Sequence, residues 1–288
     1  MSNQAQILDG KAVAKEILDA AALMVQQIKT RTGVTPCLAT VLVGDDPASV
    51  TYTRMKRKRC EDAGMKSMKV ELPDGTTTEQ LVAAIEELSN DPDVHGILLQ
   101  HPAPVDDERA AFEAIAAAKD VDGVTTASFA AISFPEDKLV GYGSCTPAGM
   151  VRLLAHYKLD IKGRHAVVIG RSAILGKPLA MMLLARHATV TICHSRTQGL
   201  ADIVRTADIV CACVGRPEFV KGDWIKPGAV VLDAGYNEGN VGDCDIAGCS
   251  QVASWITPVP GGVGPMTIAT LIEQTALGAA RQLGVELE

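Results

Sequence analysis

The chain has 288 residues, of which 47% are hydrophobic and 21% are charged, and its formal net charge at pH 7 is −7. This length allows two domains with a sizeable core, and the negative charge argues against nucleic acid as the main partner. The sequence contains no apolar run long enough to cross a membrane, and its N-terminus lacks the features of a signal or transit peptide. We therefore expect a cytoplasmic protein with no membrane partner.

The eight cysteines are scattered along the chain, and none forms a C-x-x-C pair. Several lie in apolar, strand-like runs, where a thiol packs as a small hydrophobic side chain. We therefore expect buried thiols rather than disulfides or a zinc site, and we predict no metal ion.

Helical and strand patterns alternate through the first half of the chain. Apolar residues at helical spacing predict amphipathic helices, whereas short β-rich apolar runs predict buried parallel strands. This alternation indicates a parallel α/β architecture. The predicted helices of this half cover 9–30, 48–64, 77–88 and 107–117, and the predicted strands cover 36–44, 67–73 and 94–100.

Residues 119–149 interrupt this alternation, because they are poor in periodicity and rich in Gly, Pro and Ser. We expect this segment to cross between two lobes. Strand and helix patterns then return, and a long helical pattern at 265–283 is predicted to pack back on the first lobe. The other elements predicted in this half are helices at 147–157 and 178–186, strands at 166–169, 188–193 and 229–235, and a helix followed by a strand within 201–215.

Residues 165–197 have the pattern of a dinucleotide-binding βαβ unit. A strand ends in Gly170, a loop runs to Gly176, and a helix and a second strand follow. The loop amides and the helix N-terminus can then face a pyrophosphate. The usual G-x-G-x-x-G reads here as G-x-S-x-x-x-G-K-P, so an ordinary α/β turn is an equally good interpretation of this pattern alone.

The end of the second strand favours NADP over NAD. An NAD site usually has Asp or Glu there to bind the ribose hydroxyl. This chain has Ser195 and Arg196 instead, with Arg171 in the preceding loop. Two guanidinium groups and a hydroxyl suit a 2′-phosphate, since Arg offers a rigid fork of donors to phosphate oxygens.

Four further features have the character of a functional site, although each has a simpler interpretation: a pair on one helix face, two single residues and a loop. Tyr52 and Lys56 are four residues apart and share a helix face, which could also be a solvated basic face. Gln100 ends a predicted strand, where open α/β sheets bind ligands or where a polar residue caps a loop. Asp122 could be only a turn residue. The glycine-dense loop 258–265 allows close backbone approach to a ligand, but it could also be an ordinary interdomain turn.

Seven stretches, in this order and near these spacings, carry a resemblance to a known family. They are VLVGDDPASVTYTRMKRKRCEDAG, HGILLQHPAP, KDVDG, CTPAG, GRSAILGKP, ATVTICHSRT and ITPVPGGVGPMT. Through them the chain resembles the bifunctional methylenetetrahydrofolate dehydrogenase/methenyltetrahydrofolate cyclohydrolase family over essentially its whole length. The resemblance implies a two-lobed α/β fold with a folate-binding catalytic domain (1–146 and 266–288) and a Rossmann-like NADP-binding domain (147–265). It also implies tetrahydrofolate derivatives as substrates and a homodimer.

The resemblance further implies the two reactions and the roles of four residues. Hydride would pass from the methylene bridge of the folate to NADP, and water would then attack the methenyl cation to give 10-formyltetrahydrofolate. Lys56 would transfer protons in the hydrolysis, for which its pKa must fall toward neutrality, and Gln100 would position it. Tyr52 would stack on the aminobenzoate ring, and Asp122 would accept hydrogen bonds from the pterin.

The other expected site residues fall into a substrate set and a cofactor set. For the substrate they are Leu99, His101, Pro260, Gly261, Gly262, Val263 and Gly264. For NADP they are Gly170, Arg171 and Ser172 at the phosphates, Ser195 and Arg196 at the 2′-phosphate, and Tyr236 near the nicotinamide.

Several residues depart from the family pattern. His101 stands where an apolar residue is usual, and Tyr236 replaces a smaller aliphatic residue. A titratable ring beside the reacting lysine could alter its pKa. Three alternatives therefore stay open: a dehydrogenase with weak hydrolysis, a non-catalytic folate-binding paralogue, and an NADP dehydrogenase for another small substrate.

Overall fold

The computed structural model of the chain describes residues 4–134 and 139–287. Contacts divide the chain into two compact units, which we call the small-sheet unit and the large-sheet unit. The described residues of Glu16–Gly143 and Ile268–Glu288 form the small-sheet unit, and those of Met1–Lys15 and Ser144–Thr267 form the large-sheet unit. Two long helices, α1 (Gly10–Thr32) and α10 (Val263–Gln282), contribute residues to both. Both units combine helices with parallel sheets, which confirms the predicted α/β class.

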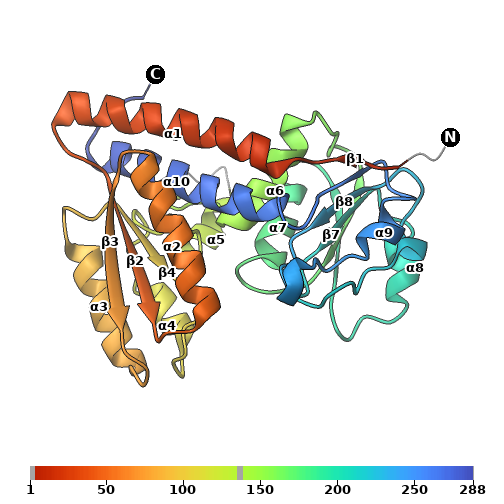
Figure 1. The fold of residues 1–288 in the computed structure, drawn as a ribbon, viewed down its shortest axis with the longest axis horizontal. Coiled ribbons are helices and arrows are strands. Elements are labelled where there is room, and N and C mark those ends of the chain that lie inside the picture. Colours follow the sequence, from red (N-terminus) through yellow and green to blue (C-terminus); the bar gives the residue numbers. More distant parts are fainter. Residues whose placement is uncertain (1–3, 135–138, 288) are drawn as a thin grey trace. The chain divides into compact units, whose positions relative to one another are not determined.

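The small-sheet unit is built on three parallel strands. Its elements are β2 (Cys37–Val43), α2 (Pro47–Asp62), β3 (Lys66–Leu72), α3 (Thr78–Asn90), β4 (Gly96–Leu99), α4 (Glu108–Glu113) and α5 (Thr126–Ser133). The strand order is β3-β2-β4. All seven residues of β2 are buried, as expected for a continuous apolar run in the centre of a covered parallel sheet. Figure 1 shows α2 and α3 on opposite sides of this sheet.

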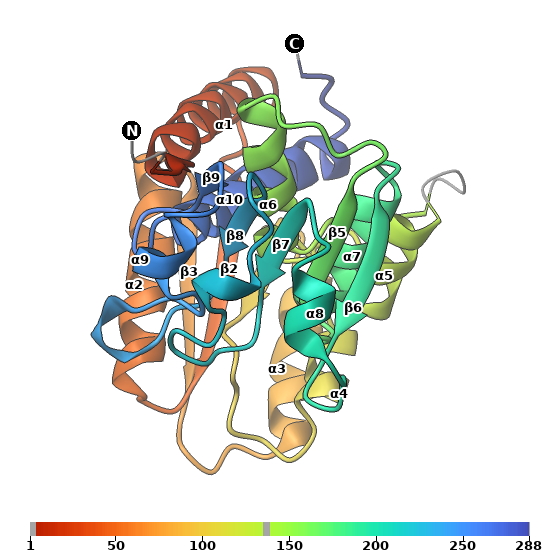
Figure 2. The same cartoon turned by 90° about the vertical axis from the view of Figure 1, so that its right-hand side faces the viewer.

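The large-sheet unit contains six parallel strands in the order β1-β9-β8-β7-β5-β6. Figure 2 shows β6, β5, β7 and β8 following one another across the sheet. The chain adds β6 on one side of β5 and then β7 on the other side, so the order of strands reverses between β5 and β7. Open α/β sheets bind ligands at the carboxyl ends of the two strands that flank such a topological switch point. The elements are β1 (Gln6–Ile7), α6 (Cys145–His156), β5 (His165–Ile169), α7 (Gly176–Leu184), β6 (Thr189–Cys193), α8 (Leu200–Val204), β7 (Ile209–Ala212), η2 (Gly222–Trp224), β8 (Val230–Asp233), η3 (Glu238–Asn240), α9 (Ile246–Cys249) and β9 (Trp255–Ile256).

The N-terminal segment groups with the large-sheet unit, whereas the sequence division placed it in the first lobe. The cause is the pairing of β1 with β9, in which Gln6 lies beside Trp255 and Ile7 beside Ile256. The final helix does return to the small-sheet unit, as predicted. The Gln274 side chain donates to the carbonyls of Val121 (2.7 Å) and Gly143 (2.9 Å) there.

One helix in the segment expected to be irregular was not predicted. α5 begins after Thr125, whose hydroxyl accepts the backbone N–H of Ser128 at 3.1 Å. This is an ordinary N-cap. Because α5 has only eight residues and little amphipathic spacing, its apolar pattern does not distinguish it from a loop.

All eight cysteines are thiols, and seven of them are buried. Burial raises the pKa of Cys60 and of Cys211 to about 12. Burial likewise raises the pKa of Cys37, Cys193 and Cys213. The structure therefore confirms the interpretation of these residues as packed thiols. None of the helices within the described ranges combines the length and the apolarity needed to cross a membrane.

Candidate active site

Helix α2 presents Tyr52 and Lys56 on one face. Asp46 fixes the start of this helix, because its carboxylate accepts the backbone N–H of Ser49 at 2.8 Å. The Lys56 side chain is buried, with 7% of its surface exposed. Its Nζ donates to Gln100 Oε1 at 3.1 Å and lies 5.7 Å from the centroid of the Tyr52 ring. A solvated basic face does not describe Lys56, since a buried ammonium group requires such partners.

The orientation of the Gln100 amide is set by its neighbours. Its backbone N–H donates to the carbonyl of Val41 at 2.9 Å, which continues the β2–β4 pairing to the strand end. Its side-chain Nε2 donates to the carbonyl of His101 at 2.7 Å, so Oε1 is left to accept from Lys56. Leu99, the residue before it, is buried in β4. Gln100 therefore links the strand end to the lysine.

His101 lies in the turn after β4 and interacts with α4. Its Nδ1 lies 2.8 Å from one carboxylate oxygen of Glu108 and 2.9 Å from the other. The hydrogen bond to Glu108 raises the pKa of His101, and partial burial opposes this rise. Asp122 also raises the pKa of His101, whereas Lys56 lowers it. These opposing effects show that the charges of Lys56, His101 and Asp122 act in one neighbourhood.

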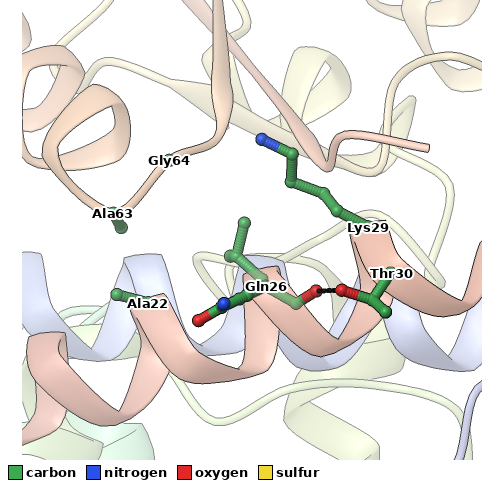
Figure 3. Close-up of a pocket in the computed structure, with 7 residues that line it drawn as sticks. Ala22, Gln26, Lys29, Thr30, Ala63 and Gly64 are labelled. Carbon is green, nitrogen blue, oxygen red and sulfur yellow. Dashed lines mark hydrogen bonds between the residues drawn. The ribbon is translucent and has the colours of Figure 1, made fainter. Parts of the chain in front are cut away.

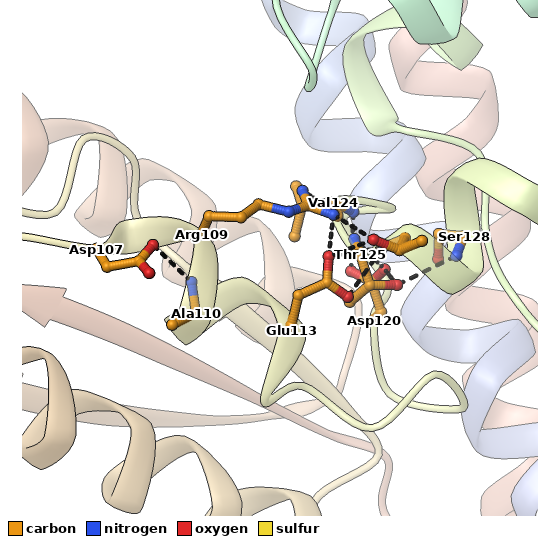
Figure 4. Close-up of polar contacts among 9 residues, drawn as sticks. Asp107, Arg109, Ala110, Glu113, Asp120, Val124, Thr125 and Ser128 are labelled. Carbon is orange, nitrogen blue, oxygen red and sulfur yellow. Dashed lines mark hydrogen bonds and ion pairs between the residues drawn. The ribbon is translucent and has the colours of Figure 1, made fainter.

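The turn that carries Asp122 is held by a different carboxylate, Asp120. Asp120 is fully buried and accepts the backbone N–H groups of Val124 (3.0 Å) and Thr125 (2.9 Å) and the Thr125 hydroxyl (2.7 Å). Burial raises the pKa of Asp120, and these hydrogen bonds together with one from Ser128 oppose the rise. Figure 4 shows these donors converging on Asp120. Sequence reasoning missed this residue, although Asp two positions before Asp122 in KDVDG was a visible signal.

A neighbouring ion pair fixes the same turn from α4. Arg109 pairs with Glu113 and donates to the carbonyl of Val124 at 2.8 Å. Glu113 in turn accepts the Thr126 backbone N–H at 3.0 Å. Asp122 itself is half-buried. The chain on both sides of Asp122 is thus held by hydrogen bonds, which limits the directions in which its carboxylate can face.

In the large-sheet unit, the predicted phosphate turn depends on two glycines. A Cβ on Gly170, whose φ is +130°, would lie 2.2 Å from the carbonyl oxygen of Cys213. A Cβ on Gly176 would lie 2.2 Å from the carbonyl oxygen of Gly170. The Ser172 hydroxyl accepts the backbone N–H groups of Leu175 (3.2 Å) and Gly176 (3.3 Å), so it closes the loop at the start of α7. Only glycine fits at both crowded positions.

The predicted 2′-phosphate residues lie at the end of the adjacent strand. Ile169 and Cys193 are paired in β5 and β6, so the loops that follow leave the same edge of the sheet. Ser195 and Arg196 are exposed, as is Arg171. The His194 backbone N–H donates to the Thr197 hydroxyl at 2.8 Å, which fixes the turn between them. Exposed cations on fixed turns beside a glycine-lined loop fit a dinucleotide phosphate.

Two buried carboxylates brace the loop that carries Tyr236. Asp233 accepts the backbone N–H groups of Asp243 (2.9 Å) and Cys244 (2.8 Å), while burial raises the pKa of Asp233. Asp243 accepts the backbone N–H of Gly215 at 2.9 Å, next to the end of β7. Tyr236 is 58% exposed, and its hydroxyl donates to the side chain of Asn240 at 2.6 Å. Sequence reasoning did not identify this pair of aspartates.

The glycine-dense loop leads from β9 into the first turn of α10. Gly262 donates its N–H to the carbonyl of Pro258 at 2.8 Å, and Lys11 donates its N–H to the carbonyl of Gly261 at 3.1 Å. A Cβ on Gly10 would lie 1.8 Å from the Gly262 carbonyl oxygen, so backbone meets backbone here. Burial varies along the loop: Pro260 is exposed, Gly261, Gly262 and Val263 are buried, and Gly264 is half-buried.

The structure thus collects the predicted residues in two places. Tyr52, Lys56, Gln100 and His101 lie together in the small-sheet unit, within electrostatic reach of Asp122. The predicted cofactor residues and the loop from Pro260 to Gly264 belong to the large-sheet unit.

A pocket of about 310 Å³ lies elsewhere, between α1 and the turn after α2 (Figure 3). None of the predicted site residues lines it, and its lining has one cationic side chain, Lys29. The lining residues are Ala22, Val25, Gln26, Lys29, Thr30, Ala63 and Gly64. Among the described residues, no group of three or more His, Cys, Asp or Glu side chains is placed to hold a metal ion.

Comparison with known proteins places this geometry in a family context. The bifunctional protein FolD 1 of Streptomyces avermitilis is 62% identical over 283 residues, which cover 98% of each chain. The solved structure of the bifunctional enzyme FolD, a methylenetetrahydrofolate dehydrogenase/cyclohydrolase from Campylobacter jejuni, has a TM-score of 0.92 at 40% identity and covers 96% of this chain and 99% of its own. The Trypanosoma brucei enzyme of the same name, solved with NADP cofactor and an inhibitor, has a TM-score of 0.92 at 35% identity and covers 96% and 98%.

Two family descriptions match the chain itself. Residues 8–122 match the catalytic domain of tetrahydrofolate dehydrogenase/cyclohydrolase, and residues 144–283 match its NAD(P)-binding domain. Together with the full-length relatives, these matches show that the chain belongs to the tetrahydrofolate dehydrogenase/cyclohydrolase family.

Proposed function

We propose that the chain oxidises 5,10-methylenetetrahydrofolate to the methenyl compound with NADP and then hydrolyses that compound to 10-formyltetrahydrofolate. The observation that carries this proposal is the buried Lys56, which donates to Gln100 at a strand end and lies beside the Tyr52 ring. Membership of the family and the bifunctional relatives support both activities.

In the hydrolytic step, Lys56 would act on protons. Water that attacks the methenyl carbon must lose a proton, and a neutral Lys56 amine can accept it. Gln100 Oε1 accepts a hydrogen bond from that amine and so fixes where its nitrogen lies. The cationic substrate and the desolvated site would both favour the neutral form of a buried lysine. Tyr52 would offer its ring face to the aminobenzoate group.

The remaining substrate contacts follow the chemistry of the folate. Asp122 would accept hydrogen bonds from the amino edge of the pterin, for which a carboxylate in a constrained turn is suited. Leu99 and His101 flank Gln100 and would line the pterin side of the site. The loop from Pro260 to Gly264 would close over the substrate, since its glycines allow close backbone approach.

On the cofactor side, NADP supplies the hydride acceptor when it is bound. Gly170, Arg171 and Ser172 would hold its phosphates with backbone amides and a cation. Ser195 and Arg196 would bind the 2′-phosphate, and Tyr236 would lie near the nicotinamide ribose. The exposed guanidinium groups on braced turns support the choice of NADP over NAD, as does the NADP in the Trypanosoma brucei relative.

The proposal extends to the organisation of the protein. Residues 1–146 and 266–288 would serve as the folate-binding catalytic domain, and residues 147–265 as the NADP-binding domain. We further propose that the chain acts as a homodimer in the cytoplasm, with neither nucleic acid nor a membrane as a partner. The negative net charge supports the exclusion of nucleic acid.

One spectrophotometric time course tests the proposed function. The protein is mixed with methylenetetrahydrofolate and NADP, and the experiment is repeated with NAD. NADPH formation without lasting methenyl absorbance is expected. Persistent methenyl absorbance would show a dehydrogenase without effective hydrolysis, and no reaction with either cofactor would overturn the assignment.

A further inference from the structure

We propose that His101 and Glu108 form a charge-dependent clamp on the turn Gln100–Ala103, and that this clamp positions Gln100 against Lys56 for the hydrolytic step. The inference rests on the proposed function and assigns positioning roles to two residues that flank the lysine–glutamine pair.

The clamp has two attachment points on one carboxylate. Glu108 Oε1 accepts the backbone N–H of Ala103 at 2.6 Å, and both Glu108 oxygens lie within 2.9 Å of His101 Nδ1. Glu108 is the first residue of α4, and the preceding Asp107 caps that helix by accepting the Ala110 N–H at 3.0 Å. The carboxylate therefore extends from a fixed helix start and holds the turn at two of its residues.

The turn passes this constraint on to Gln100. The His101 carbonyl accepts from Gln100 Nε2 at 2.7 Å, which directs the amide oxygen toward Lys56. If the His101 carbonyl rotated away, the Gln100 side chain would lose the acceptor that keeps Nε2 on one side and Oε1 on the side of Lys56. An amide turned by 180° would offer an NH₂ group, which cannot hydrogen-bond to the Lys56 ammonium and would occupy the lone pair of the neutral amine that must accept the proton from water.

The strength of the clamp depends on the charge of His101. Because Nδ1 faces a carboxylate, it carries the proton in both charge states, and Nε2 is the atom that titrates. The hydrogen bond to Glu108 raises the pKa of His101, so the ion pair is complete below the ordinary pKa and weakens as pH rises through the raised value. A neutral Nδ1–H···carboxylate hydrogen bond remains above that pH, and it is weaker than the charged one.

Among the described residues, two groups contact the His101 ring and two more act on it through their charges. Glu108 and Phe112 approach from α4, with the Phe112 ring centroid 6.3 Å away, and Lys56 from α2 and Asp122 from the following turn act through their charges. Charged His101 and charged Lys56 repel each other. By reciprocity, a protonated His101 disfavours the ammonium form of Lys56, which is the form that cannot accept a proton from water.

Two substitutions separate the hydrogen bond from the charge. His101→Gln can keep a donor for Glu108 but never carries a charge, whereas His101→Arg keeps the charge at every pH used. We expect His101→Gln to lower the hydrolysis rate about three- to tenfold and to move the acid-side midpoint of its pH profile upward by roughly half a pH unit. His101→Arg should leave that midpoint at or below the wild-type value.

Glu108→Gln tests the carboxylate, and Glu86→Gln is its matched control on the exposed side of α3. The Glu108 variant should lose hydrolysis rate, while the control should match wild type. The dehydrogenase rate is measured on every sample, and in the His101 variants it should fall less than the hydrolysis rate, because hydride transfer does not use the Lys56 amine as a base. This rate also reports whether each variant has folded.

The outcomes separate the clamp from the proposed function. Wild-type protein that forms NADPH and hydrolyses the methenyl product, with a shifted profile only in His101→Gln, supports both. A His101→Gln variant with the wild-type rate and pH profile overturns the clamp and leaves the proposed function standing. Wild-type protein without hydrolysis overturns both. Equal losses of both activities in His101→Gln would show a merely structural role.

Discussion

The candidate sites of the two units differ in how far their side chains are buried. In the small-sheet unit, the candidate catalytic groups are buried side chains: Lys56 and Gln100 are at most 8% exposed and bind each other directly. In the large-sheet unit, the candidate phosphate ligands Arg171, Ser195 and Arg196 are exposed. Proton transfer needs one nitrogen at one place, whereas a phosphate can be bound by several donors from several directions.

Side chains brace turns in both units, and the phosphate loop of the large-sheet unit is also constrained by close backbone contacts. Side-chain hydrogen bonds to Asp120 and Glu108 hold the turns of the small-sheet unit. Backbone close approaches at Gly170 and Gly176 hold the loop of the large-sheet unit. The comparison predicts that single substitutions will damage one activity and spare the other.

The largest effect is expected from Lys56→Ala. Loss of the proposed proton acceptor should reduce hydrolysis by roughly 10²- to 10⁴-fold, while NADP affinity stays nearly unchanged. Hydrolysis of methenyltetrahydrofolate and NADP binding are measured separately. Lys58→Ala is the control, because Lys58 is on the same helix, its side chain is 71% exposed, and it forms a surface ion pair with Asp62. Hydrolysis that persists in Lys56→Ala would show that another group is the base.

The opposite pattern is expected when the phosphate residues are changed. Arg171→Ala combined with Ser195→Asp removes a cation and adds a carboxylate that can bind a ribose hydroxyl, so cofactor preference should move toward NAD by about 10- to 100-fold. The ratio of kcat/KM for the two cofactors measures this change, and hydrolysis of added methenyltetrahydrofolate should be retained. Arg164→Ala, an exposed arginine of the same unit, serves as control. An unchanged ratio would place 2′-phosphate recognition elsewhere.

A loss of similar size is expected from Gly176→Ala. The new methyl group would overlap the Gly170 carbonyl and displace the loop at a cost of about 1–3 kcal/mol, which would raise the KM for NADP roughly ten- to a hundredfold. Gly163→Asn is the control, because nothing lies within 4 Å of a Cβ there and asparagine tolerates its φ of +74°. If Gly176→Ala bound NADP normally, backbone crowding would not shape this loop.

The smallest effect is expected from Thr197→Val. This change removes the acceptor for the His194 N–H and loosens the turn that carries Ser195 and Arg196, so the KM for NADP should rise about two- to tenfold. The KM for NAD should change less, since NAD lacks the 2′-phosphate. Equal changes for both cofactors would mean that the turn supports the unit as a whole rather than the 2′-phosphate.

The sequence predicts most of the elements because their patterns are strong. The run Cys37–Val43 is apolar throughout, and a glycine-bracketed turn precedes α7, so both were expected near their observed positions. β1 was not predicted, because a two-residue strand exists only through its pairing with β9, which lies about 250 residues away in the chain. α5 was not predicted because it is short and capped rather than amphipathic.

The same distinction applies to the candidate site. Residues with a recognisable chemical type, such as Lys56 and Gln100, can be selected from the sequence, and the structure brings them into contact. Supporting residues such as Glu108 and Asp243 are common acidic residues whose function depends on which backbone N–H groups they reach. Those distances are set by the folded chain and have no short-range signature in the sequence.

The packed thiols have a practical consequence for measuring these effects. The thiolate is the reactive form of cysteine, and a thiol whose pKa is near 12, as in Cys60 and Cys211, is almost entirely protonated at neutral pH. Maleimide and iodoacetamide reagents should therefore leave Cys60 and Cys211 largely unmodified, and burial shields five of the other six native thiols. A cysteine introduced at exposed Ser195 would be labelled selectively, and a fluorophore there would report cofactor arriving at the turn in real time.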